Sequence, residues 1–440
     1  SGTVGNTAVG YRAGYEVSTG TANTLVGMQA GLNLTTSSGS IAIGTSALAV
    51  STTGNSNIAI GNIAMNGGNT TGDNNIGIGQ VTGDALTSGY ENIMLGKNAG
   101  TDLTTGNNNI LIGADSGKSL QGVGNNICIG TSTLSLATTD ADQNIAIGNG
   151  AMSGNFTSAN VNFNIAIGTN SQAGVLTSAT SATVSIGYKA LNALTSGGGN
   201  IAIGESTGED ITTGQYNTII GTQAMQNAQT DVSNVVAVGW RAGYKLGDDG
   251  GSDHSENNIL IGVAAGGGGN STVANNTANT NVAIGNYSLA GNNANTAFTS
   301  TNCVAIGHEA LDSIQSGYSN TAVGYAAGDS ITSGTFNTLI GTSVDVSAAG
   351  ASNQIVVGYA ATGQGDNTIT LGNTGMTDVY MNQNGGAKVR AGSMIISSST
   401  AIGSTTSSLL VQGSGSEVFA VEGTNGRLFS VNDEMSGSIF

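Results

Sequence analysis

This 440-residue chain contains no proline and little charge, cysteine or aromatic character. Collagen needs abundant proline and glycine at every third position, so it is excluded although 72 residues are glycine. Disordered chains carry many charges and few aliphatics, whereas here 8% of residues are charged and 38% are hydrophobic. No apolar run approaches the roughly 18 residues of a membrane-spanning helix. With only 4% aromatic residues, we expect thin repeated layers in place of an ordinary globular core.

Cationic residues are also scarce: nine Lys and Arg stand against 26 Asp and Glu, a formal net charge of −17. Nucleic acid is therefore not an expected partner, because phosphate neutralisation needs a basic face. The two cysteines, Cys128 and Cys303, are too few and too far apart for a disulfide framework. No targeting segment is visible, and both ends look cut from a longer chain.

An internal repeat dominates what is present. An aliphatic residue followed by glycine recurs 21 times, mostly 17 or 18 residues apart, with wider steps of up to 23 between Gly239 and Gly307. A typical copy is Asn57-Ile58-Ala59-Ile60-Gly61, with a small residue three positions after the glycine. A second short apolar–polar piece, such as Leu103-Thr104-Thr105-Gly106, begins seven residues after the glycine.

The repeat predicts an all-β parallel β-solenoid of the β-roll type. Seventeen residues suit two short strands and two tight turns, because Ile, Val and Thr favour strands and Gly or Asn supplies turns with positive φ. We expect about 17 residues per coil and 21 coils over residues 1–372. At about 4.8 Å per coil, the 20 intervals from Gly10 to Gly372 span about 95 Å. Residues 373–440 depart from the repeat and predict a β-rich shaft, truncated at its C-terminal end.

The position four before the glycine is Asn in 15 of the 21 copies. Stacked in register, these side chains are expected to form an amide ladder that satisfies polar groups of the turns. The position three after the glycine is Ala, Ser or Thr in 19 copies, which suits a tight corner. Neither position is expected to be catalytic, because each recurs along the whole rod.

All three residues before each glycine are mostly apolar, which indicates burial on both faces of the strand. One face can fill the coil, and the other would leave on the order of 1,000 Å² exposed, more than a soluble monomer usually leaves bare. We expect a parallel homotrimer, intertwined or side by side, with the middle residue of each triplet, such as Leu111 or Leu260, facing a partner chain or the shared axis.

Runs such as Asn57–Gly61 and Asn200-Ile201-Ala202-Ile203-Gly204 resemble the head repeats of trimeric autotransporter adhesins. That resemblance covers residues 1–372 and implies a trimer of parallel β-rolls. The segment Gly426–Asp433 resembles the shafts of fibre proteins from tailed bacteriophages, which often carry adhesin-like rolls upstream.

Together the two resemblances imply a structural tail fibre of a tailed phage, extracellular on the virion, that spaces or presents host-receptor binding. Its partners would be two further copies, other virion tail proteins, and a host surface glycan or outer-membrane receptor. One alternative is the head of a bacterial adhesin on the cell surface, and a second is a tailspike that depolymerises glycan.

Chemical motifs are weak, so we expect no enzyme, no metal site and no cofactor. Residues 113–119 resemble a phosphate-binding loop but have three residues between the glycines where four are needed. The neighbours Glu209 and Asp210 would point to opposite faces on a strand, unlike the paired carboxylates of a glycosidase, and a simple exposed turn is the expected structure. One acidic loop could suit calcium but lacks EF-hand spacing. It contains Asp248, Asp249, Asp253, His254 and Glu256.

Recognition is more plausible on the long repeats, because extra residues in a solenoid emerge as surface loops. The candidates are residues 153–163, 245–257, 267–280 and 291–302. Aromatic side chains near Asn and Asp are typical of glycan binding, and capping of coil edges is the alternative. The aromatic residues that could contact glycan are Tyr90, Phe156, Phe163, Tyr216, Trp240, Phe298, Tyr318 and Phe336.

Overall fold

The structure is a computed structural model that divides into two compact units, Ser1–Met376 and Thr377–Phe440. It describes residues 5–137, 141–156, 160–177, 180–228, 232–247, 255–267, 278–291, 298–376 and 379, and the strands at 419–423 and 426–431. Within these residues no helix occurs, and therefore none that could span a membrane.

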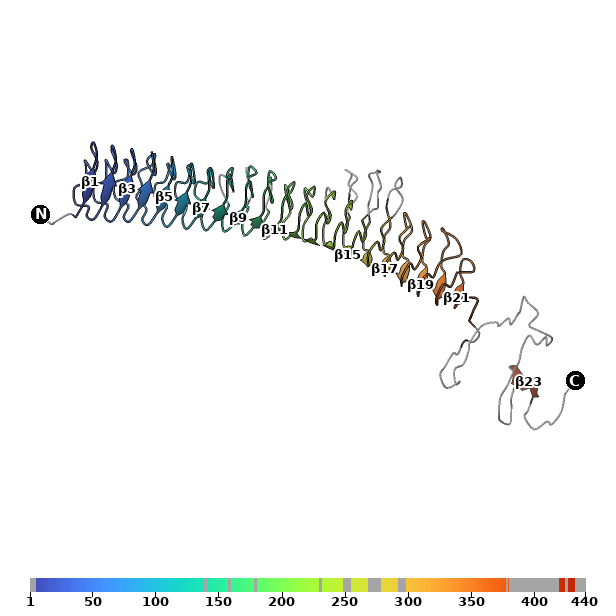
Figure 1. Cartoon of the computed structure of the whole chain (residues 1–440). Helices are drawn as coiled ribbons and strands as arrows, with labels where there is room; N and C mark the ends of the chain where they lie inside the picture. Colours follow the sequence, from blue (N-terminus) through green and yellow to red (C-terminus); the bar gives the residue numbers. More distant parts are fainter. Residues whose placement is uncertain are drawn as a thin grey trace. The chain divides into compact units, whose positions relative to one another are not determined.

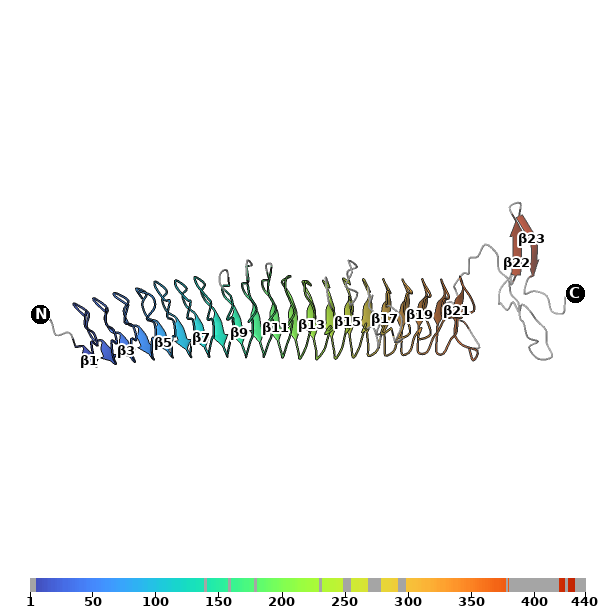
Figure 2. The same cartoon turned by 90° about the horizontal axis from the view of Figure 1, so that it is seen from above.

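The first unit is a parallel β-solenoid, which confirms the predicted fold (Figures 1 and 2). One three-residue strand from each repeat joins a 21-stranded parallel sheet without a register shift, so that Ile58 pairs with Ile76 and Ile76 with Ile93. The strands are β1 (Thr7–Val9), β2 (Thr24–Val26), β3 (Ile41–Ile43), β4 (Ile58–Ile60), β5 (Ile76–Ile78), β6 (Ile93–Leu95), β7 (Ile110–Ile112), β8 (Ile127–Ile129), β9 (Ile145–Ile147), β10 (Ile165–Ile167), β11 (Val184–Ile186), β12 (Ile201–Ile203), β13 (Thr218–Ile220), β14 (Val236–Val238), β15 (Ile259–Ile261), β16 (Val282–Ile284), β17 (Val304–Ile306), β18 (Thr321–Val323), β19 (Thr338–Ile340), β20 (Ile355–Val357) and β21 (Ile369–Leu371).

The glycine after each strand is required twice over. Its φ is 133° at Gly130 and 129° at Gly148, a region that residues with a Cβ rarely adopt. A Cβ on Gly130 would also lie 2.7 Å from the carbonyl oxygen of Gly148, and one on Gly148 would lie 2.6 Å from that of Gly168. The glycine column therefore lets the backbones stack at this corner of every coil.

The predicted Asn ladder is confirmed. Asn109 Oδ1 accepts hydrogen bonds from the backbone nitrogen and the Nδ2 of Asn126, at 3.1 and 3.2 Å, and Asn109 Nδ2 donates to the carbonyl of Val123 at 2.9 Å. The same bonds link Asn75 with Asn92 and Asn92 with Asn109. These amides are buried, so the ladder satisfies turn groups that have no access to water.

The other side of the coil differs from the prediction of two strands per repeat. There, in the described coils, hydrogen bonds to the next coil are present, but they form isolated bridges in place of a ladder. The carbonyl of Thr35 accepts from the backbone nitrogens of Ser18, Thr19 and Gly20 at 3.0, 3.1 and 3.2 Å. Three successive donors converge on one acceptor, so the chain turns where a second strand would have to run straight.

The interior of the solenoid is filled by three rows of small and aliphatic side chains. The middle residue of each strand is buried in nearly every coil, including Leu111 at 0% and Leu260 at 1% exposure. The small residue three after the glycine and the aliphatic residue seven after it, such as Ala99 and Leu103, complete the core. The expectation that the middle residue faces a partner chain is therefore wrong, because that side chain closes the coil of its own chain.

The two flanking residues of each strand face outward. Ile203, Ile261 and Ile306 are each 37% exposed, and their neighbours in the same rows are half-buried or exposed. The last residue of the strand is Ile, Val or Leu in all 21 copies, and the first is Ile or Val in 16 and Thr in five. We call these two rows, which follow β1 to β21 along the whole rod, the aliphatic stripe.

The second unit contains an antiparallel pair, β22 (Phe419–Gly423) and β23 (Gly426–Val431). Phe419 pairs with Val431, and the register shifts between Val421 and Glu422. Apart from these strands and residues 373–376 and 379, the predicted shaft over residues 373–440 lies outside the described residues.

Candidate functional site

The side chains that follow each strand project outward at one corner of the coil, because the backbone turns sharply there. In the coil of β14 this corner reads Gly239-Trp240-Arg241-Ala242-Gly243-Tyr244-Lys245. Gly239, Arg241 and Gly243 have φ of 135°, 56° and 62°, while Ala242 is fully buried. The turn therefore buries Ala242 in the core and places Trp240, Arg241 and Tyr244 on the surface.

These three side chains form a stacked group. The Arg241 guanidinium carbon lies 4.8 Å from the centroid of the Trp240 ring and 4.6 Å from that of Tyr244. Arg241 Nε donates a hydrogen bond of 2.9 Å to Oε1 of Gln223, which occupies the same repeat position one coil earlier. Two rings and one amide thus hold the guanidinium in a defined plane.

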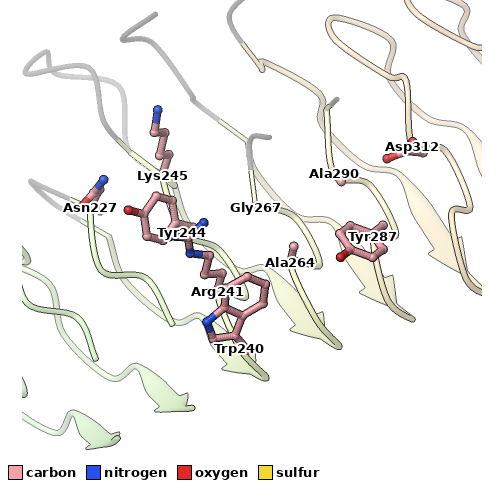
Figure 3. A pocket seen from close by; sticks show the side chains of 10 residues that line it. All are labelled: Asn227, Trp240, Arg241, Tyr244, Lys245, Ala264, Gly267, Tyr287, Ala290 and Asp312. Carbon is pink, nitrogen blue, oxygen red and sulfur yellow. The ribbon is translucent and has the colours of Figure 1, made fainter. Parts of the chain in front are cut away.

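Beside this group lies a groove of about 490 Å³, which we call the Trp240 groove (Figure 3). Ala264 and Gly267 in the coil of β15 lie between Trp240 and Tyr287, which belongs to the coil of β16. The coil of β15 carries Ala264 where the neighbouring coils carry Arg241 and Tyr287, and it carries Gly267 where the coil of β14 carries Tyr244, so the floor of the groove is low. The lining residues are Asn227, Trp240, Arg241, Tyr244, Lys245, Ala264, Gly267, Tyr287, Ala290 and Asp312.

The groove is locally cationic in an acidic chain. Among the described residues that line the groove, Arg241 and Lys245 are basic and Asp312 is the one carboxylate, so these residues carry 2 − 1 = +1. Past the groove, Tyr287 meets His308 edge-on at 6.0 Å between centroids, and His308 stacks on Tyr325 at 5.5 Å. Aromatic side chains therefore continue along this corner toward β18.

For two of the aromatic residues, the prediction of glycan contact is wrong. Phe156 is 0% exposed and Phe298 is 2% exposed, and both lie in the core. The interior of a wide coil has to be filled by a large side chain, and in these two elongated repeats phenylalanine does so. Neither ring can reach a surface ligand.

The remaining predicted aromatics are exposed, but they do not form one site. Trp240 lies at the groove, whereas the other five precede the Asn position at a different corner of the coil. Tyr318 and Phe336 contact each other edge-on at 5.2 Å. The exposed fractions lie between 43% and 64% for Tyr90, Phe163, Tyr216, Trp240, Tyr318 and Phe336.

Glu209 does not have the properties of a catalytic acid. Lys189 Nζ lies 2.8 Å from its Oε1, and Gln226 Nε2 donates to its Oε2 at 3.0 Å. Burial alone would raise the pKa of Glu209, but hydrogen bonds from Lys189, Ser206 and Gln226 outweigh it and lower that pKa. A general acid needs a raised pKa, so this carboxylate is a surface ion-pair partner.

A carboxyl pair that sequence reasoning missed lies between neighbouring coils. Burial raises the pKa of Asp329, and the negative charges of Asp345 and Glu309 and a hydrogen bond with Asp345 raise it further. Glycosidase carboxylates stand about 5 to 9.5 Å apart to flank the scissile bond. Two carboxyls in direct hydrogen-bond contact leave no such space between them.

The other weak motifs also have local explanations. In the phosphate-loop-like segment, Lys118 Nζ lies 3.7 Å from Asp115 in an exposed ion pair. No group of three potential metal ligands occurs among the described residues, and Asp248, Asp249, Asp253 and His254 lie outside them. Burial raises the pKa of both cysteine thiols, and neither Cys128 nor Cys303 forms a disulfide.

The sequence contains a second copy of the pattern that forms the stacked group. Gly10-Tyr11-Arg12-Ala13-Gly14-Tyr15-Glu16 repeats the pattern of residues 239–245 in the first coil. There the Arg12 guanidinium lies 4.6 Å from the centroid of the Tyr15 ring. Comparing the two copies would have identified the arginine–aromatic unit without any structure.

Searches with protein-family models and among curated proteins return no match to this chain.

Proposed function

We propose that the chain is a segment of an extracellular attachment fibre, the tail fibre of a tailed phage, in which three parallel copies form a rod that presents host-receptor binding. The observation that carries the proposal is the aliphatic stripe. It consists of two rows of Ile, Val, Leu and Thr that leave no coil from β1 to β21 without an outward apolar side chain.

A stripe of this shape favours copies of the same chain as its cover. It runs about 95 Å at the coil spacing, and only a partner of equal length and equal repeat can follow it coil by coil. Three stripes about one axis would cover one another completely, and each would contribute on the order of 1,000 Å², the scale of stable interfaces. A long, thin assembly of this kind suits spacing and presentation.

The molar mass of the chain in solution tests the proposal. We expect the full chain to have three times its 43.1 kDa by light scattering. Ile129→Asp with Ile306→Asp should give folded monomers, because three like charges would meet at each level of the interface and each buried charge costs several kcal/mol. Both positions are 37% exposed in the single chain, so the coil itself tolerates the change.

Gln121→Asp with Ser316→Asp is the matched control, since both residues are exposed and lie off the stripe in nearby coils. The control should remain trimeric. A monomer for the unmodified chain at micromolar concentration would end the proposal. Immunogold labelling of virions against cell envelopes then separates a phage fibre from a bacterial adhesin head.

A further inference from the structure

We propose that the Trp240 groove binds an acidic saccharide, a sugar unit that carries a carboxylate on a pyranose ring. The inference rests on the proposed function, because it names the chemistry that such a fibre would recognise at a cell surface. It is carried by the shape of the groove and by its fixed cation, and a second copy of the arginine–aromatic motif elsewhere in the chain supplies a control.

The shape suits one pyranose ring. Trp240 and Tyr287 lie two coils apart, which is about 10 Å at the coil spacing. Carbon atoms in contact are about 3.5 to 4 Å apart, so a sugar ring between the two side chains would touch both. Ala264 and Gly267 leave the space between them empty (Figure 3). Trp240 is 45% and Tyr287 is 42% exposed, so both have ring surface to offer.

The charge suits a carboxylate. A guanidinium binds a carboxylate through two parallel hydrogen bonds, and this requires a fixed plane. The rings of Trp240 and Tyr244 and the bond from Nε to Gln223 fix that plane at Arg241. Lys245 lines the same groove and adds a second positive charge.

The combination favours sugar over other anions. Aromatic side chains recognise the apolar C–H face of a pyranose, which inorganic phosphate lacks. A nucleic acid strand would bring many charges toward a chain of net charge −17 and would be repelled outside the groove. The Asn227 amide and the Asp312 carboxylate line the groove and are groups of the kind that bind sugar hydroxyls.

The first coil supplies an internal comparison. Tyr11, Arg12 and Tyr15 occupy the same repeat positions as Trp240, Arg241 and Tyr244. The next coil, however, places Gln29 and Leu32 where the groove has Ala264 and Gly267, and Glu16 stands where the groove has Lys245. The first coil therefore has the stacked arginine without the open floor or the second cation. We expect it not to bind an acidic saccharide.

The test uses the full chain and the fluorescence of Trp240, the only tryptophan in the sequence, so the signal comes from the groove. The probes are tetragalacturonic acid, a sialic acid dimer and the fully methyl-esterified tetragalacturonate. We expect saturable fluorescence changes with at least one acidic probe. The methyl ester should bind about tenfold more weakly than the tetragalacturonic acid, because it keeps the rings and loses the charge.

Two variants target the groove, and calorimetry measures their affinity. Arg241→Ala should weaken acidic binding by about tenfold or more, since a charge-assisted hydrogen bond is lost. Ala264→Gln should fill the space between Trp240 and Tyr287 and so weaken the binding of the acidic probes. Both changes suit the backbone, because Ala326 and Ala360 take φ of 47° and Gln29 and Gln223 take 59° and 58° at the same repeat position. Arg12→Ala is the matched control and should bind as the unmodified chain does.

The inference fails if neither acidic probe gives a saturable change, or if tetragalacturonic acid and its ester bind equally well. It also fails if Arg12→Ala weakens binding as much as Arg241→Ala, or if an acetylated tetraglutamate peptide binds more tightly than both acidic sugars. Light scattering on the same samples keeps the two proposals apart. Lost binding with the trimer intact contradicts only the groove, whereas a monomer that binds contradicts only the fibre.

Discussion

Leu111 and Ile112 are neighbours on β7, both aliphatic, yet they lie on opposite sides of the solenoid wall. Leu111 is fully buried inside its own coil, and Ile112 belongs to the outward aliphatic stripe. The inward row stabilises each coil, and the outward row is free to stabilise contact between chains. Hydrophobicity alone does not separate the two roles.

The composition of the rows over all coils does separate them. The inward row is Ala in 10 of 21 coils, whereas neither outward row contains Ala. A coil of about 17 residues is narrow, and its interior must also hold the small residue three after the glycine and the aliphatic residue seven after it. Alanine is therefore confined to the inward row, a pattern that is visible in the sequence.

The largest effect is expected from charge on the inward row. Leu111→Asp should bury an unpaired carboxylate at a cost of several kcal/mol and unfold neighbouring coils, whatever the state of assembly. Ile112→Asp should leave the β-type circular dichroism intact and disturb only assembly. If the two variants lose the same amount of β signal, the distinction between the faces is wrong.

A smaller effect is expected from the Asn ladder, which is polar but lies inside. Asn109→Ala removes the acceptor of two bonds from Asn126 and the donor to Val123, so buried groups lose their partners. The cost should be about 1 to 3 kcal/mol in urea unfolding of the full chain. Thr105→Ala, at an exposed position of the same coil, should change the unfolding free energy very little.

The smallest effect concerns an exposed charge. Burial, together with Asp345 and Glu309, raises the pKa of Asp329, so the folded state binds that proton more tightly than the unfolded state does. The penalty is therefore present above the folded pKa and disappears as the pH falls through it. Asp329→Asn should stabilise the chain by a few tenths of a kcal/mol at pH 7, since the group is largely exposed.

The gain should vanish below about pH 4, the ordinary range of an Asp pKa. Asp102→Asn, another exposed carboxylate, is the control, and thermal melts across this pH range make the measurement. A gain that grows as the pH falls would contradict the sign of this linkage.

Much of the fold was predictable because the repeat carries it. The period gave the parallel solenoid, and the Asn position gave the ladder. The absence of a second strand was not predictable from Leu-Thr-Thr-Gly segments, since the convergence of Ser18, Thr19 and Gly20 on the Thr35 carbonyl is a backbone property. The inward position of Leu111 was missed because polarity was considered and the frequency of alanine at the same position of other coils was not.

The groove was only partly predictable. The sequence contains Trp240 and the repeat places Arg241, Ala264 and Tyr287 at one position of successive coils, so their difference in size was available. The stacking of Arg241 between two rings depends on side-chain conformation, which the repeat does not encode. The burial of Phe156 and Phe298 depends on the width of individual coils, which varies with the length of each repeat.

The central claim is that the outward row, and not the inward row, meets the same row of parallel copies. Cross-linking through a single cysteine tests it most directly. Ile203 is 37% exposed on the stripe, whereas Gln215 is exposed off the stripe, between β12 and β13. The native thiols should not interfere, because both are buried and burial raises their pKa.

Under mild oxidation we expect Ile203→Cys to form covalent dimers within the trimer, because in-register copies bring this position against itself. We expect Gln215→Cys to remain uncross-linked. Cross-linking of Gln215→Cys with none for Ile203→Cys would contradict the account.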